Sequence, residues 1–144
     1  MDGKELEIPD REDRGTQYGR AAVNAVKYVI EGTIDDPREA WDKGIKDETD
    51  SHESINKGCP RAAFLGLCEE GKVKGIPSGD YTSSKKNKRY TLVGLKKLQK
   101  QPHLADNKAD LWSEVMDRLG KSKKEAEQMD VLTKLWKEDL LEIR

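Results

Sequence analysis

The segment TQYGRAAVNAVKYVIEG, residues 16–32, decides the fold class because its apolar residues recur with a helical period. They form a broad stripe on one side of a helix, the pattern of a helix that packs against a core. The stripe consists of Ala21, Ala22, Ala25, Val26, Tyr28, Val29 and Ile30. Gly32 follows it, and a glycine there ends a helix well because it adopts a left-handed conformation without a Cβ clash. We therefore predict a helix from about residue 16 to residue 31.

Five further segments combine a start signal with a helical apolar period. Asp36 and Pro37 begin the next helix, because aspartate caps a helix and proline suits its first turn. The other helices are predicted to begin at Cys59-Pro60, at Thr82 to Ser84, near Asp106 or Asn107, and at the capping box Ser122 with Glu125. The fold class is therefore predicted to be all-α, a compact bundle of about six helices. The turn-rich stretch at residues 72–82 leaves room for one short hairpin.

The length and composition fit one domain, since domains usually contain about 100–150 residues and this chain has 144. Residues 1–14 are charged and show no apolar period, so we predict a mobile tail there and a single helical domain over residues 15–144. No window approaches the ~18 consecutive apolar residues of a membrane span, and no secretory signal is recognisable. We expect a cytoplasmic protein with no membrane partner, whose two cysteines are thiols.

The charged residues are balanced overall, with 27 Lys+Arg and 28 Asp+Glu, but they are distributed unevenly. Residues 72–100 contain nine basic residues and one acidic residue, a net charge of +8. Such a block attracts an anion from outside or an acidic surface of the same protein. A run of eight carboxylates between Asp35 and Glu53 offers an internal partner. The sequence leaves both interpretations open.

The basic segment gives the main hypothesis on function. Lys85, Lys88 and Arg89 fall three and four residues apart on a predicted helix and share one side of it, while Leu92, Leu95 and Leu98 are expected on the buried side. The preceding turn adds lysines, an aromatic ring, and hydroxyls beside free amides at a helix N-terminus, where anions bind. Helix, basic turn and basic helix together resemble a nucleic-acid-binding arrangement of the helix-turn-helix kind.

We therefore predict a non-enzymatic binding module that contacts nucleic acid or another polyanion. The alternative is a protein-interaction or inhibitor domain that acts on a charged protein partner. The overall isoelectric point of about 6.2 lies below that of a dedicated DNA-binding domain, which keeps the alternative open. The candidate binding residues are Lys72, Lys74, Tyr81, Ser84, Lys85, Lys86, Lys88 and Arg89.

Signals of catalysis and metal binding are weak, so we expect no metal and no cofactor, and the sequence favours the absence of enzymatic activity. Cys59 is the one catalytic candidate, because a helix N-terminus lowers the pKa of a thiol, and His52 or His103 would be its base. The spacing of cysteines and histidines does not match a structural zinc site. The paired carboxylates Glu69 and Glu70 could do acid–base work if buried, but in so charged a chain we expect them to be exposed.

The stretch KGCPRAAFLGLCEEGKVKGIPSGDYTSSKKNKRY, residues 57–90, is unlike a generic helical sequence. It resembles the central block of a family of small uncharacterised bacterial and phage-associated helical proteins, a domain of unknown function. The sequences YGRAAVNAV (18–26) and PREAW (37–41) resemble the first two helices of that family, and QMDVLTKLW (128–136) resembles its closing segment. The resemblance spans roughly residues 16–140. It implies no activity, but it marks residues 57–90 as the characteristic part of the domain.

Overall fold

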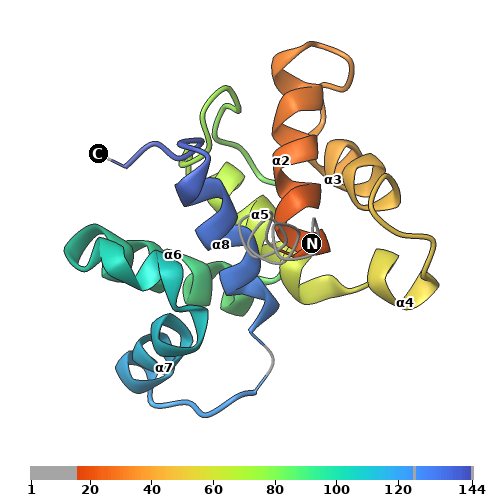
Figure 1. The fold of residues 1–144 in the computed structure, drawn as a ribbon. Helices are drawn as coiled ribbons and strands as arrows, with labels where there is room; N and C mark the ends of the chain where they lie inside the picture. The colour runs from red at the N-terminus through yellow and green to blue at the C-terminus, as the bar shows by residue number, and fades with distance from the viewer. Residues whose placement is uncertain (1–15, 125, 144) are drawn as a thin grey trace, which may run out of the picture.

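Helices build the whole fold, as the sequence pattern predicts (Figure 1). The computed structural model describes residues 16–124 and 126–143. Within them, six helices of three to four turns are joined by a one-turn helix and a 3-10 turn. The six are α2 (Gln17–Ile30), α3 (Pro37–Lys46), α5 (Gly58–Glu69), α6 (Lys85–Lys100), α7 (Lys108–Leu119) and α8 (Glu127–Lys137). The short elements are α4 (His52–Ile55) and η1 (Pro102–Asp106). The tail predicted at residues 1–14 lies outside the described residues.

Local capping fixes several helix ends where the sequence places them. Thr16 Oγ1 accepts a hydrogen bond from the Gly19 N–H at the start of α2, and the Asp36 carboxylate accepts one from the Arg38 N–H at the start of α3. Gly32 follows α2 with φ of +81°, the left-handed conformation that a C′ glycine adopts easily. The helix that the sequence predicts to begin at Ser122 is α8, and it begins only at Glu127.

The late start of α8 has a physical reason in the contacts of the preceding segment. The Trp112 indole N–H donates to the Lys123 carbonyl at 2.8 Å, so this segment is bound to the side of α7. A helix beginning at Ser122 would withdraw that carbonyl from the indole. The predicted capping box at Ser122 is therefore wrong, and its other member, residue 125, lies outside the described residues.

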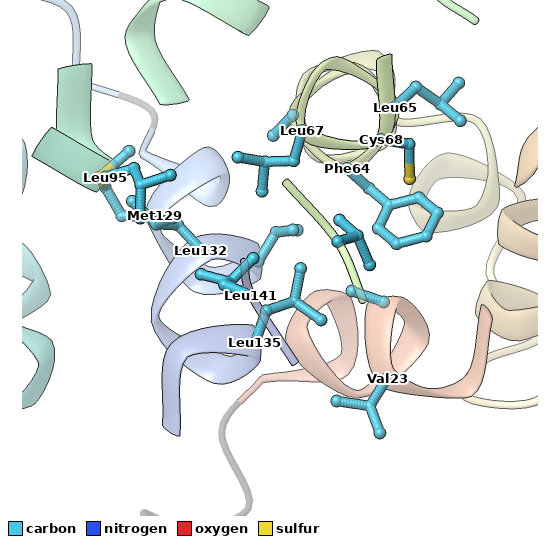
Figure 2. Close-up of a cluster of buried hydrophobic side chains, with 14 of the residues drawn as sticks. Val23, Phe64, Leu65, Leu67, Cys68, Leu95, Met129, Leu132, Leu135 and Leu141 are labelled. Carbon is cyan, nitrogen blue, oxygen red and sulfur yellow. The ribbon is translucent and has the colours of Figure 1, made fainter. Parts of the chain in front are cut away.

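The core lies where α5 and α8 meet in the centre of the bundle (Figures 1 and 2). On one side α2 packs against α3 and α8, and on the other side α6 packs against α5, α7 and α8. Phe64, Leu67 and Leu135 are fully buried between these layers, and the Phe64 ring lies 5.6 Å from that of Trp41 on α3. The outer helices thus bury one apolar face each, while the central helix α5 is buried on all sides from Ala62 to Cys68.

No hairpin forms at residues 72–82, which corrects that part of the prediction. Val73 instead makes a single antiparallel bridge with Leu141, and the Lys74 N–H donates to the Leu140 carbonyl at 2.9 Å. The reason is burial: Val73 and Leu141 are both buried, and pairing them closes the core between α5 and the end of the chain. No described helix is both long enough and apolar enough to cross a membrane.

The close packing of α2 on α3 depends on Gly44 and can be tested there. A Cβ at Gly44 would lie 2.6 Å from the Ala21 carbonyl oxygen, and backbone cannot move aside as a flexible side chain can. We expect Gly44→Val to lower the free energy of unfolding by about 2 kcal/mol or more, because overpacking strains the core. Urea denaturation followed by circular dichroism measures the change.

Gly58→Val is the matched control, because a Cβ at this helical position would meet no atom within 4 Å. We expect it to change the free energy of unfolding by less than about 0.5–1 kcal/mol. Equal effects of the two substitutions would contradict the account of the α2–α3 contact.

Candidate functional site

The carboxylate of Glu69 organises the region where the basic segment begins. Glu69 ends α5, and its side chain is only 6% exposed, so the expectation of an exposed residue is wrong. Its Oε1 accepts the backbone N–H groups of Tyr81 and Thr82 at 2.8 and 3.0 Å. Its Oε2 accepts the ammonium groups of Lys85 and Lys88 at 2.9 and 2.6 Å. One buried carboxylate therefore attaches both the loop and the first turn of α6 to the end of α5.

These donors determine the ionisation of the site. The hydrogen bond from Lys88, aided by the Thr82 amide and by Lys85, holds the pKa of Glu69 far below its usual range, although burial alone would raise it. The same contacts raise the pKa of Lys88, whose ammonium also pairs with Glu70. Glu69 and Lys88 are therefore both charged across the neutral pH range.

Close helix packing leaves Lys88 little freedom to reach an external ligand. Its side chain is 16% exposed, and a Cβ at Gly66 on α5 would lie 2.7 Å from the Lys88 Cβ. Lys85 is more exposed, but its ammonium bonds both Glu69 and the Thr82 carbonyl. The anion bound at the start of α6 is thus the chain's own carboxylate.

The acidic run between Asp35 and Glu53 finds its partners elsewhere. Asp36 pairs with Arg38, Asp42 with Arg61, Asp47 with Lys43, and Glu48 with Arg20. These basic residues belong to α2, α3 and α5, not to the segment 72–100. Internal pairing does occur in the basic segment, but its main partners are Glu69 and Glu70, which adjoin it in the chain.

Three other candidate residues also have contacts inside the protein. The Tyr81 hydroxyl donates to the Pro77 carbonyl at 2.8 Å, and Ser84 Oγ accepts from the Asn87 amide at 2.9 Å. Lys74 pairs with Asp139 at 3.2 Å. The segment 70–84 that joins α5 to α6 is also far longer than the turn of about 3–4 residues in a helix-turn-helix.

A basic groove of about 820 Å³ lies along α6 beyond this cluster. Its charged lining contains eight basic residues and a single acidic one, Glu70. The basic residues are Lys72, Lys85, Lys88, Arg89, Lys96, Lys97, Lys100 and Arg118. Leu92 and Val93 line the groove as well; both are half-buried and pack against the core, so Leu92 lies at the edge of the buried side of the helix. Lys74, Tyr81, Ser84 and Lys86 are not among the lining residues.

The groove combines paired and unpaired cations. Lys85 and Lys88 are held by Glu69, and Lys97 pairs with Glu114 at 3.4 Å. Within residues 16–124 and 126–143, the structure shows no ion pair for the other five basic side chains. These five, which we call the free basic set, are Lys72, Arg89, Lys96, Lys100 and Arg118.

The sequence names Lys72 and Arg89 as candidate binding residues and places Lys96 and Lys100 on later turns of the same basic helix, without counting these two among the candidates. Lys96 and Lys100 follow Arg89 by seven and eleven residues, a spacing that keeps all three near one side of a helix. Arg118 belongs to α7 and reaches the groove only because α7 packs on α6. No local signal in the sequence indicates it.

The thiols and histidines form no comparable site. Cys59 is half-buried in the first turn of α5, and no hydrogen bond joins it to a histidine in the part of the chain that the structure describes. Cys68 is buried in the core, and burial raises the pKa of its thiol. The described residues contain no group of three or more His, Cys, Asp and Glu side chains that could hold a metal ion.

The role of Glu69 is testable with Glu69→Gln, which removes the charge and keeps the size. We expect the free energy of unfolding to fall by about 1–3 kcal/mol at neutral pH, since two ammonium groups lose a buried counterion. The pKa of Glu69 is lower in the folded chain than in the unfolded chain, where a glutamate has a pKa of about 4.3. The stabilisation is therefore complete above that value and is lost as the pH falls below it. Urea denaturation should show the difference between wild type and variant shrinking from about pH 5 to pH 2.

Glu70→Gln is the control on the adjacent residue. Glu70 is exposed and binds Lys88 alone among the described residues, so we expect a cost below about 1 kcal/mol. Two results would contradict the role given to Glu69. The first is a loss of unfolding free energy in Glu69→Gln that does not change with pH, and the second is an equal loss in Glu70→Gln.

Comparison with known proteins places the chain by family alone. No curated protein and no solved structure matches it significantly. A family model does match, over residues 15–142, which agrees with the extent of the resemblance found in the sequence. This match covers nearly the whole chain and all the helices described above. The chain therefore belongs to the family of unknown function DUF6979.

Proposed function

We propose that this protein binds nucleic acid, with the phosphate backbone lying in the basic groove along α6. The observation that carries the proposal is the free basic set, five cationic side chains that line one groove and form no ion pair with any residue the structure describes. An unpaired cation that faces water attracts a polyanion strongly, because each phosphate contact releases condensed counterions. The chain's overall charge of -1 does not exclude this, since no residue of the acidic run lines the groove and four of its carboxylates pair with basic residues of α2, α3 and α5.

The spacing of the cations along α6 suits a chain of phosphates. Arg89 and Lys100 are eleven residues apart, which corresponds to about 16 Å at the ~1.5 Å rise of a helix. That distance spans about five base pairs at ~3.4 Å each. Lys72 and Arg118 extend the basic surface from the segment after α5 and from α7. Four or five phosphate contacts would give a slope of log affinity on log salt of about −4 for duplex DNA.

A second candidate function rests on the apolar residues of the same groove. Leu92 and Val93 are half-buried among the cations, and an acidic amphipathic helix could lay its apolar face on them. The protein would then be an interaction or inhibitor domain for an acidic protein partner. Leu92→Ala with Val93→Ala distinguishes the two, because it would weaken a helical partner and leave phosphate contacts intact.

Charge reversal in the groove tests the proposed function. We expect Lys96→Glu with Lys100→Glu to weaken binding of a fluorescent duplex of about 20 base pairs at least tenfold and to lower the salt slope by about two. Fluorescence anisotropy at several salt concentrations measures both quantities, and circular dichroism verifies folding. A wild-type protein that fails to bind at low salt would rule out the proposed function.

Lys27→Glu with Lys46→Glu is the matched control. Both lysines are exposed, lie in the last turns of α2 and α3, and change the net charge by the same amount. We expect this variant to keep a salt slope close to that of the wild type, because neither lysine lines the groove. A loss equal to that of the groove variant would show attraction by overall charge and would contradict a localised site.

A further inference from the structure

We infer that the groove takes double-stranded rather than single-stranded nucleic acid and binds it through the backbone. This inference rests on the proposed function and adds the form of the ligand. It follows from the kinds of side chain that line the groove and from the positions of all the aromatic rings in the chain.

Proteins that bind single strands combine cationic residues with aromatic side chains on which unpaired bases stack, at about 1–3 kcal/mol per base. The chain has eight aromatic residues, and all of them belong to the described residues. They are Tyr18, Tyr28, Trp41, Phe64, Tyr81, Tyr90, Trp112 and Trp136. None of the eight lines the groove. The apolar part of the groove is instead aliphatic, made by Leu92, Val93 and Leu95, and offers no π-face to a base.

The rings nearest in sequence to the groove are held in other contacts. Tyr90 belongs to α6 itself, but it is 2% exposed and meets the Trp112 ring edge-on at 5.7 Å. Tyr81, a candidate binding residue from the sequence, donates its hydroxyl to the Pro77 carbonyl, and its ring packs so close to Gly79 that a Cβ there would lie 2.8 Å from the ring. Bringing either ring into the groove would break a packed contact.

Base-edge recognition by amides also has little support in the groove. Gln99 is the one amide side chain in the lining, and its Nε2 donates to the Ile143 carbonyl at 3.1 Å. The remaining polar groups are the cations, with Glu70 as the single carboxylate. A groove that acts by charge favours the duplex, which carries one charge per ~1.7 Å of its axis against ~3.4 Å for each strand.

The experiment compares a fluorescent duplex of about 20 base pairs with one of its strands, of unstructured sequence, at the same salt concentration in the anisotropy assay. We expect the full-length protein to bind the duplex at least about tenfold more tightly than the single strand. A single strand that binds within tenfold of the duplex, or more tightly, would overturn the inference while the proposed function stands. Failure of both probes would overturn the proposed function itself.

A gain-of-function variant gives an independent measurement. Leu92→Tyr puts an aromatic ring among the cations at a half-buried position, where the larger side chain has access to the groove. We expect it to raise the affinity for the single strand several-fold, at about 1 kcal/mol for one stacked base, with little change for the duplex. If the folded variant binds the single strand no more tightly than the wild type, then the missing aromatic ring is not the reason for weak single-strand binding. That result would count against the inference.

Discussion

A single buried carboxylate determines how the basic segment of this chain is used. Glu69 accepts two backbone amides and two ammonium groups, so it fixes the loop before α6 and the direction in which α6 leaves α5. Removing a charge from such a buried cluster is costly, because the remaining ions lose both water and partner. The rest of the basic helix then extends beyond the reach of Glu69, and its later cations line an open groove.

The separation of charged side chains from the apolar core explains how a chain with 38% charged residues folds. Many charged groups among the described residues meet an opposite charge on their own or a neighbouring helix, as Asp42 does with Arg61 and Lys108 with Asp130. The apolar residues are left to a narrow core around α5 and α8. Surface ion pairs of this kind add little stability individually, at about 0–1 kcal/mol, so the core carries the fold. Other exposed lysines in the described part of the chain, such as Lys27 and Lys46, also show no ion pair, but only the free basic set gathers in this groove, and for that reason we propose a partner there.

Local signals predicted most of the fold, and non-local contacts account for what they missed. The helix starts at Thr16 and Asp36 and the stop at Gly32 depend on neighbouring residues, so the sequence reveals them. The hairpin failed because Val73 pairs with Leu141 at the far end of the chain. The capping box at Ser122 failed because Trp112 binds the segment that follows it.

In the candidate site, too, local signals predicted one part and non-local contacts determine the other. The helical spacing of the lysines predicted a basic face, but counting charges favoured the long acidic run as the internal partner. The internal partner is instead the nearest carboxylate in space, because the packing of α5 on α6 puts Glu69 directly beside Lys85 and Lys88. Arg118 enters the groove through tertiary packing alone.

Lysine acetylation mapped by mass spectrometry, with and without duplex DNA, tests the central claim most directly. We expect Lys96 and Lys100 to react fast in the free protein and to become protected by the duplex, while Lys88 reacts slowly in both states because it is only 16% exposed and pairs with Glu69. Lys27 and Lys46 should react fast in both. The account is contradicted if the duplex leaves Lys96 and Lys100 as reactive as before, or if Lys88 reacts as fast as they do in the free protein.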